Sequence, residues 1–390
     1  MLTSAPSLAR KARPWQVALL VTGLALAWQT LLVYGYFGGR WSALFLASDR
    51  FSQSLPVREE GSYVLPGSGG YDGQFYHAIA HDPLDLRETD RFLDFPPTRY
   101  TRILLPALSY ALGFGRLFWV DRVYRALELA GLFLGVFCVG AWAESRNRSV
   151  WWGAAFLSLP GVFISLERQL ADLPLCALLA AALLSQDRRE KKACWVSLAS
   201  AGLVREMGFV AIGGFMLAAA REKRWKDVTV WASAAIPGAI WNAYVFRFIP
   251  HPSAMQPATP ILNLFVSMRH LQEYPFGLAV SAALHGFDRI AIAGGLLSLV
   301  LGLLEGVRKG PLGSVGVMLA CFGVAVSGYA DYKEVYSFAR AGSPLLLIQL
   351  FQAIETGSLL VLAPLGLMLP RSLAINARMT ILSIFRLAGR

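Results

Sequence analysis

Apolar runs of membrane-spanning length recur along almost the whole chain, and they constrain its fold more than any other feature. The first run covers 14–37, and the series continues to Leu369 with short polar or basic loops in between. Because a helix needs about 20 apolar residues to cross a bilayer, we predict roughly ten to twelve crossings. The expected fold is an all-α polytopic membrane protein with a single transmembrane domain over 1–390. The first run is too long for a signal-peptide core, so we interpret it as a retained helix.

Basic residues stand at the ends of the apolar runs and predict the orientation of the chain. The net charge is +11, but no continuous basic face with interleaved aromatics is visible, so nucleic acid is not an expected partner. The basic groups are Arg10, Lys11 and Arg13; Arg188, Arg189, Lys191 and Lys192; Arg221, Lys223, Arg224 and Lys226; and Arg308 and Lys309. The positive-inside rule makes these groups cytoplasmic, which leaves 38–102 as a long first outer loop. Residues 371–390 are expected to form a basic C-terminal tail.

The outer loop contains an acidic and aromatic segment after a glycine-rich stretch at 67–70. Residues 71–81 predict a short juxtamembrane helix, with Phe75, Tyr76 and Ile79 on one face. Asp72 shares that face at the helix start, where it is a candidate for chemistry. An N-cap is the alternative role for this aspartate. Two prolines at 96 and 97 then predict an extended approach to the next apolar run.

Patterns that would bind a metal are weak. The four cysteines, Cys138, Cys176, Cys194 and Cys321, show no paired spacing and are expected to be small buried hydrophobes. His77 and His81 are four residues apart, as a metal pair on a helix requires, but the HExxH pattern is absent. We therefore expect both histidines on the wet side of the helix, with metal binding as the less favoured alternative.

Two later segments predict helical hairpins, and one segment resists assignment. Residues 150–186 are expected to turn at 167–172, and residues 193–220 at Arg205 and Glu206. The second turn then lies on the same side as Asp72. Between 103 and 143 two apolar pieces flank a charged stretch, and one piece must be partial or re-entrant if the basic groups are all cytoplasmic.

Arginines near the outer ends of the predicted spans suggest an anion site. The candidates are Arg99, Arg102, Arg168, Arg205 and Arg340. A single arginine there is explained by snorkelling, whereas several on one face suit the two-pronged recognition of a phosphate. Asp172 is a second functional carboxylate or a helix cap, and Glu206 is a further carboxylate or an ion-pair partner of an arginine.

Short motifs in these segments resemble bacterial integral-membrane glycosyltransferases of the GT-C superfamily. The motifs are Asp-Gly-Gln-Phe-Tyr at 72–76, Pro-x-x-Arg-Tyr-x-Arg-Ile-Leu-x-Pro at 96–106, Leu-Val-Arg-Glu-Met-Gly at 203–208 and Tyr-x-x-x-Arg at 336–340. The resemblance implies a GT-C-like helical bundle, a polyprenyl-phosphate-linked sugar donor and a catalytic acid in the first outer loop, here Asp72. The motif has one acid where some members have two, which leaves a divalent metal as the one cofactor still open. Thr98 stands where an aromatic is expected before Arg99.

The resemblance implies an inverting transfer of a sugar to a glycan or lipid acceptor at the periplasmic face of a bacterial inner membrane. In this transfer Asp72 is expected to take the proton of the acceptor hydroxyl. The donor phosphate is expected to be held by Arg99, Arg102, Arg205 and Arg340. The side chains expected to line the sugar or lipid are Tyr71, Gln74, Phe75, Tyr76 and Tyr100.

Two other classes of function fit the same residues. A transporter or flippase would use these arginines and carboxylates to bind a lipid-linked or anionic solute, but would need polar residues along a complete pathway. A non-catalytic subunit of an envelope polysaccharide machine would need Asp72 only as a cap.

Overall fold

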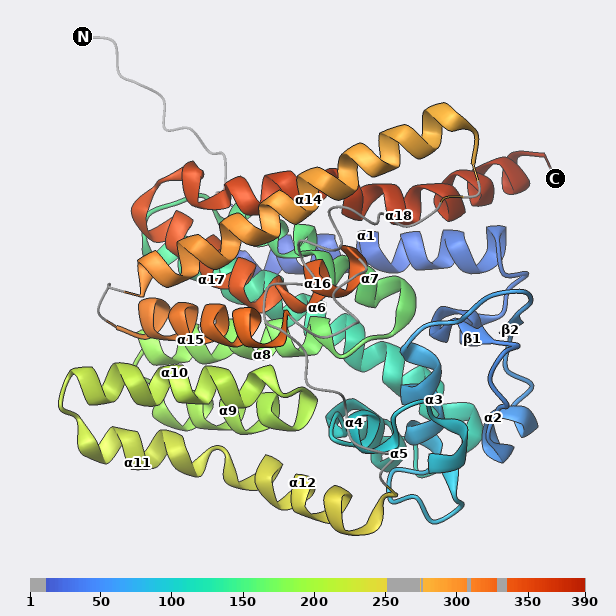
Figure 1. Cartoon of the computed structure of the whole chain (residues 1–390), viewed down its shortest axis with the longest axis horizontal. Coiled ribbons are helices and arrows are strands. Elements are labelled where there is room, and N and C mark those ends of the chain that lie inside the picture. Colours follow the sequence, from blue (N-terminus) through green and yellow to red (C-terminus); the bar gives the residue numbers. More distant parts are fainter. Residues whose placement is uncertain (1–11, 251–273, 275, 307–309, 328–334, 390) are drawn as a thin grey trace, which may run out of the picture.

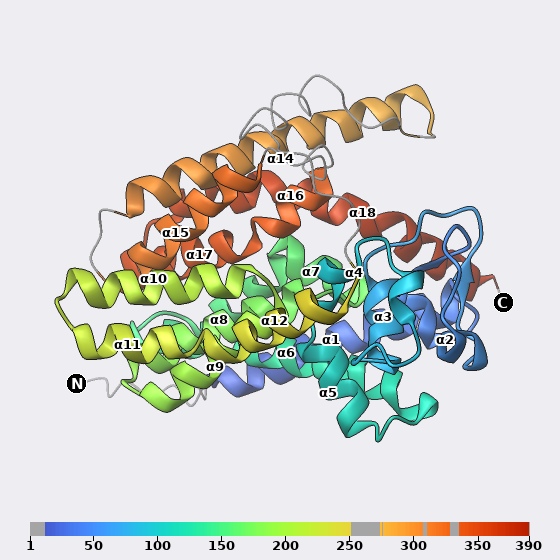
Figure 2. The same cartoon turned by 60° about the horizontal axis from the view of Figure 1, so that its bottom comes forward.

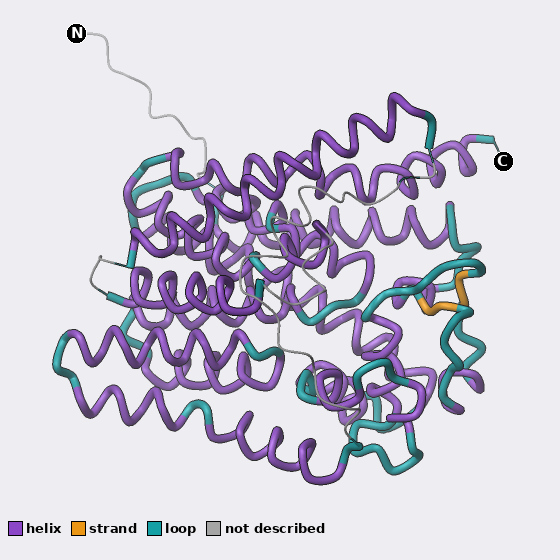
Figure 3. The backbone as a smooth tube through the Cα atoms, in the orientation of Figure 1, coloured by secondary structure: helices purple, strands orange, loops and turns teal. Residues whose placement is uncertain are grey.

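The chain folds into a bundle of helices, with one pair of very short strands (Figures 1 and 3). The computed structural model describes residues 12–250, 274, 276–306, 310–327 and 335–389. The α-helices with at least nine residues are α1 (Pro14–Gly35), α3 (Gly73–His81), α5 (Leu104–Leu112), α6 (Leu117–Ser145), α7 (Pro160–Arg168), α8 (Asp172–Asp187), α9 (Lys191–Val204), α10 (Met207–Arg221), α11 (Trp225–Ser233), α12 (Ile236–Phe248), α14 (Leu278–Glu305), α15 (Pro311–Val326), α17 (Ser343–Thr356) and α18 (Ala363–Ala388). The shorter α-helices are α2 (Leu55–Glu59), α4 (Pro96–Tyr100) and α16 (Val335–Ala341), and the strands are β1 (Ala47–Ser48) and β2 (Val64–Leu65). The 3-10 helices are η1 (Trp41–Phe45), η2 (Thr89–Phe92), η3 (Val150–Ser158) and η5 (Leu359–Leu362).

The apolar helices make this chain a polytopic membrane protein. Within the described ranges, α1, α6 and α14 are long and apolar enough to cross a membrane. Two bent pairs, η3 with α7 and Leu359–Ala374 with Ala377–Ala388, would raise that number to five. The prediction of ten to twelve crossings exceeds this number because α8, α9, α10 and α15 have only 14–16 residues each, below the length of about 20 that a full span needs.

Large apolar side chains on the outside of the bundle fit a lipid environment. On α1 the exposed residues include Leu19 and Leu24, and on α14 they include Leu278 and Leu304. Exposed apolar faces of this kind are costly in water and favourable against lipid chains.

The helices run side by side between two ends of the molecule (Figure 1). One end, the loop end, carries α2, α3 and the strand pair, in which Ala47 is paired with Val64 in parallel register. The other, the basic end, carries the α8–α9 and α10–α11 turns, where Lys191 pairs with Asp227 at 2.6 Å. The basic groups at 188–192 and 221–226 therefore lie together, at the opposite end from the first loop. Arg10, Lys11, Arg308 and Lys309 fall outside the described residues.

The segment that resisted assignment contains one short and one long helix. Helix α5 has nine residues, whereas α6 has 29 and runs on to Ser145. The first apolar piece, which forms α5, is therefore the partial one. Of these two helices, only α6 joins the loop end to the basic end. Both predicted hairpins are confirmed, since α7 is followed by α8 and α9 by α10 with turns at 169–171 and 205–206.

The first outer loop is largely folded, and two expectations about it were wrong. Every residue of α3 is buried, so this helix packs inside the loop end and does not lie on a membrane surface. Pro96 and Pro97 do not extend the chain but begin α4, because proline is favoured in a first helical turn.

The region expected to be a basic tail continues α18 as far as Ala388. This helix packs against α14 and α1. A buried ion pair between Arg371 and Asp288 of α14 holds it in place, with Nε 2.5 Å from Oδ1.

Candidate active site

Asp72 lies immediately before α3 and is held by two arginines from distant parts of the chain. Its Oδ2 accepts a hydrogen bond from Arg340 at 2.7 Å, and its Oδ1 lies 3.1 Å from Arg99 Nη2. The side chain makes no capping hydrogen bond to α3. The cap was the serious alternative for this residue, and it is wrong, because the carboxylate is turned toward the guanidinium groups. A fifth of the Asp72 side chain stays exposed, which leaves it open to a ligand.

Arg99 is fixed by a second carboxylate in the same loop. Asp94 accepts two hydrogen bonds from Arg99, 2.8 Å from Nε and 2.7 Å from Nη2. The guanidinium also lies over the ring of Phe75, 4.8 Å from its centroid, which adds a cation–π attraction. The two-pronged pair with Asp94 orients Arg99, and the contact with Phe75 joins α4 to α3, which lies beside it (Figure 2).

Asp172, at the first position of α8, links Arg340 to a third arginine, Arg205. Its Oδ1 accepts from Arg205, and its Oδ2 lies 3.0 Å from Arg340 Nε. Asp172 is almost fully buried and therefore needs these positive partners. Of the two roles predicted for it, the cap is wrong, since the residue before it occupies the N-cap position.

Glu206 continues the series of charges to Arg102. Its Oε1 accepts from Arg205 Nε at 2.9 Å, and its Oε2 lies 3.4 Å from Arg102 Nη2. Arg102 also donates to the hydroxyl of Tyr76 at 2.7 Å. The ion pair predicted for Glu206 is confirmed, and the placement of Arg205 and Glu206 on the same side as Asp72 is confirmed as well.

Together these side chains form one network of alternating charges, which we call the arginine–carboxylate network. Its members are Asp94, Arg99, Asp72, Arg340, Asp172, Arg205, Glu206 and Arg102. Each of the four arginines is more than nine-tenths buried, so snorkelling to the membrane surface is not the explanation for any of them. Burial acts to raise the pKa of Asp72, but the charges of Arg99, Arg340 and Arg102 outweigh it and hold that pKa well below its usual range.

Two glycines allow the backbone to bring the network together. A Cβ on Gly73 would lie 2.1 Å from the carbonyl oxygen of Arg168, at the end of α7. A Cβ on Gly208 would lie 2.2 Å from the backbone of Ala201, where α10 folds back on α9. Both motifs therefore use glycine for close helix packing within two residues of a charged residue.

The residues predicted to line a sugar or lipid divide into two groups. Tyr71 is partly exposed, with the guanidinium groups of Arg168 and Arg340 at 4.4 and 5.3 Å from its ring centroid. Tyr76 touches the network through Arg102. Tyr76 is itself buried, so of these two only Tyr71 keeps exposed surface beside the network.

The other three predicted lining residues have contacts of their own within the fold. Gln74 accepts a hydrogen bond from the backbone N–H of Ser48 at 3.0 Å. Phe75 and Tyr100 are buried in an apolar cluster under the loop, and the Tyr100 hydroxyl donates to Asp85 at 3.0 Å. We correct these three assignments, because a side chain buried among protein atoms offers no surface to a ligand.

Sequence reasoning gave no role to Asp94 and did not connect Arg168 with Tyr71. Asp94 was only one of many acids in the outer loop, and its spacing of five from Arg99 on a proline-broken segment gave no helical signal. Arg168 was noted among the outer arginines, yet its contact with the Tyr71 ring depends on the fold.

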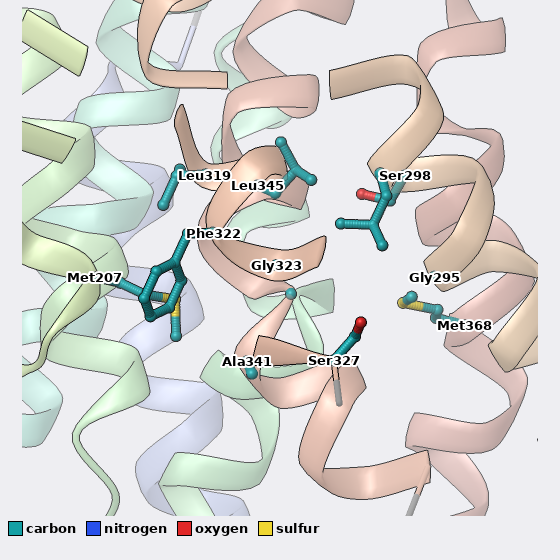
Figure 4. Close-up of a pocket in the computed structure, with 12 residues that line it drawn as sticks. Met207, Gly295, Ser298, Leu319, Phe322, Gly323, Ser327, Ala341, Leu345 and Met368 are labelled. Carbon is teal, nitrogen blue, oxygen red and sulfur yellow. The ribbon is translucent and has the colours of Figure 1, made fainter. Parts of the chain in front are cut away.

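An apolar cavity lies among the helices, and two of its lining residues are chain neighbours of network residues (Figure 4). Met207 and Ala341 line it, and they directly follow Glu206 and Arg340 in the chain. The rest of the lining comes mainly from α14, α15, α17 and α18, with the hydroxyl groups of Ser298 and Ser327 as polar exceptions. The charged network and the cavity thus share two short chain segments.

His77 and His81 lie on the other side of α3 and do not belong to the network. Both are buried beside Glu60 and Asp121, so the expectation of a wet, exposed pair was wrong. Their carboxylate neighbours come from the loop after α2 and from the first turns of α6, which the sequence pattern did not connect to them.

Comparisons with known proteins give little further guidance. No protein-family model and no curated protein matches the chain. Among solved structures, the chain is similar to the crystal structure of ArnT from Cupriavidus metallidurans in the apo state, with 15% sequence identity and a TM-score of 0.35. That similarity covers 87% of this chain and 77% of the other. The functional interpretation therefore rests on the fold and the site: a multi-pass helical membrane protein with a buried arginine–carboxylate network at one end.

Proposed function

We propose that this protein is an inverting glycosyltransferase that uses a polyprenyl-phosphate-linked sugar as donor. In this proposal it acts at the periplasmic face of a bacterial inner membrane, on a glycan or lipid acceptor. The observation that carries the proposal is the placement of Asp72 between Arg99 and Arg340, where its carboxylate serves no helix cap.

The arginines suit a donor phosphate better than they suit the carboxylates alone. A guanidinium presents several N–H donors in a planar fork, and a phosphate offers more acceptor oxygens and more negative charge than one carboxylate. Arg340 faces both Asp72 and Asp172, so a phosphate at this position would compete with Asp72 for its donors. Donor binding would therefore free the Asp72 carboxylate and move its pKa upward.

The reaction then follows from the freed carboxylate. Asp72 accepts the proton of the acceptor hydroxyl as that oxygen forms a bond to the anomeric carbon. The bond between the anomeric carbon and the phosphate oxygen breaks on the opposite face, and its electron pair stays on the polyprenyl phosphate. Charge grows on that phosphate as the sugar leaves, so Arg99, Arg102, Arg205 and Arg340 stabilise the transition state more than the ground state. One base is enough, because a phosphate leaves without being protonated.

The apolar cavity supports a lipid carrier for the sugar. Its lining is contiguous in sequence with Glu206 and Arg340, so an isoprenoid chain in the cavity would place its phosphate near the network. Ligand sites of this kind combine an apolar chamber with a few charged groups at one edge.

The test is transfer by the purified protein in lipid nanodiscs, with a radiolabelled polyprenyl-phosphate hexose and a lipid or glycan acceptor. We expect Asp72→Asn to lower turnover by about 10²-fold or more, because the amide keeps the shape but cannot take the proton. Glu88→Gln is the matched control, an exposed acid of the same loop that pairs only with Arg91 among the described ion pairs, and it should retain wild-type turnover.

Two results would overturn the assignment. Turnover of Asp72→Asn equal to that of Glu88→Gln would remove Asp72 from the chemistry. Movement of intact lipid-linked sugar across the bilayer without a new glycosidic product would favour a transporter or flippase.

A further inference from the structure

Four metal-ligating side chains meet on the face of α3 that points away from Asp72. They are His77 and His81, four residues apart on α3, Glu60 just after α2, and Asp121 near the start of α6. One ligand atom from each lies within 4.8 Å of all the others. The two histidines are nearly fully buried, whereas Glu60 keeps 16% of its side chain exposed, which gives an ion a way in.

We infer that Glu60, His77, His81 and Asp121 bind a divalent transition metal, zinc by preference, and that the metal fixes α3 to α6. Two imidazoles and two carboxylates form a donor set that suits zinc. The inference does not depend on the reaction proposed above.

Four of the six distances between the ligand atoms lie close to those of a tetrahedral centre, and the other two, between the histidines and between the carboxylates, are at most 4.8 Å. With zinc–ligand bonds of 2.0–2.2 Å, the ligand atoms of a tetrahedron stand about 3.3–3.6 Å apart. His77 Nε2 lies 2.9 Å from Asp121 Oδ1 and 3.2 Å from Glu60 Oε2. His81 Nε2 lies 3.3 and 3.2 Å from the same two atoms. All four distances are at or just below the tetrahedral value, so small side-chain shifts would admit the ion.

The charges of the cluster also favour a metal over a set of ion pairs. Two neutral imidazoles and two carboxylates carry a charge of −2, which one divalent ion neutralises. Protonating both histidines gives the same balance, but it places a charge on two rings whose buried Nδ1 atoms have no hydrogen-bond partner in the part of the chain that the structure describes. An unpaired N–H on a charged ring costs more than one on a neutral, metal-bound ring.

The rings are already held in place for binding. Phe45 stacks on His77, with centroids 4.1 Å apart and planes 5° from parallel. The ligands come from three segments, so a bound ion would link the loop after α2, helix α3 and helix α6. Asp72 is one residue before α3, and its distance to Arg99 and Arg340 depends on where that helix lies.

The experiment measures metal on the purified full-length protein. We expect about one zinc per chain by mass spectrometry after purification without chelator, and restoration of that content when ZnCl₂ is added to chelator-treated protein. Co²⁺ in place of zinc should give the intense visible absorption bands of a tetrahedral site. His81→Asn and the milder Glu60→Gln should each weaken zinc binding by about tenfold or more, while His285→Asn on α14 serves as the histidine control and should bind zinc normally.

Thermal unfolding provides a second readout. Zinc should raise the unfolding temperature of the chelator-treated wild type and of His285→Asn, but not that of His81→Asn. A folded wild type that takes up no zinc or cobalt would overturn the inference. Equal zinc content in Glu60→Gln, His81→Asn and the wild type would also overturn it, since the metal would then be elsewhere.

Discussion

Arg340 donates a hydrogen bond to Asp72 across 268 residues of sequence. Arg340 belongs to α16, near the end of the chain, whereas Asp72 precedes α3 in the first outer loop. The contact exists only when these two regions are folded against each other, and α16 packs on α7 beside it. The site is therefore assembled from distant segments, and its parts can be tested separately.

We expect lysine to be a poor substitute for the arginines that hold Asp72. Arg340→Lys and Arg99→Lys keep the charge but lose the planar fork, so turnover should fall by about tenfold or more. Arg91→Lys is the control, because Arg91 is 68% exposed and its contact with Glu88 is a surface ion pair. Steady-state rates at saturating donor measure the effect. Unchanged rates in both site variants would remove the phosphate-binding role of these arginines.

Gly73 should tolerate no side chain. An added Cβ would lie 2.1 Å from the Arg168 carbonyl oxygen and 3.0 Å from that of Phe45, so α3 must shift. We expect Gly73→Ala to lower the unfolding temperature and to reduce turnover together, because Asp72 moves with the helix. Gly69→Ala, four residues earlier in the glycine-rich stretch that precedes α3, meets no described residue within 4 Å and should behave as wild type in both measurements. A neutral Gly73→Ala would contradict the close packing of α3 on α7.

The sequence was a good guide to the charged network because charge in an apolar chain is rare. Arg205 and Glu206 stood out between two apolar runs, and so did Asp172, and each belongs to the network. The cost of burying a charge makes a partner necessary, although it does not say which partner.

The interpretations that failed depended on contacts between distant segments. Asp72 was compatible with a cap because its position before a helix is typical of one, and only the nearby guanidinium groups of Arg99 and Arg340 draw it away. His77 and His81 looked like a wet face because their carboxylate neighbours are 17 or more residues away. Helical periodicity identifies which residues share a face, but it does not say what covers that face.

Thiol labelling in intact cells should show that the loop end faces outward. Leu86→Cys in the first loop, a position that is 79% exposed, should react with a membrane-impermeant maleimide. Lys192→Cys at the basic end should react only after the membrane is permeabilised, because positive residues are retained in the cytoplasm. Cys138, Cys176 and Cys194 are buried and should stay unlabelled, and the exposed Cys321 on α15 is replaced by serine in both variants. The opposite labelling pattern would place the network in the cytoplasm and exclude a periplasmic enzyme.

The pH dependence of turnover should reveal that the donor competes for the arginines. In the free protein the positive charges of Arg99, Arg340 and Arg102 hold the pKa of Asp72 well below its usual range. A bound donor phosphate takes up those charges and adds its own negative charge, so the pKa of Asp72 rises in the complex. The free enzyme determines the acid limb of kcat/KM for the donor, and the complex determines that of kcat. As pH falls, kcat should therefore decline first, while kcat/KM holds to lower pH. Both acid limbs are measured with saturating acceptor. If the acid limb of kcat/KM lies at the same pH as that of kcat, or at higher pH, Asp72 keeps its arginine partners throughout the reaction. That result would rule out the idea that the donor phosphate displaces Asp72 from the arginines.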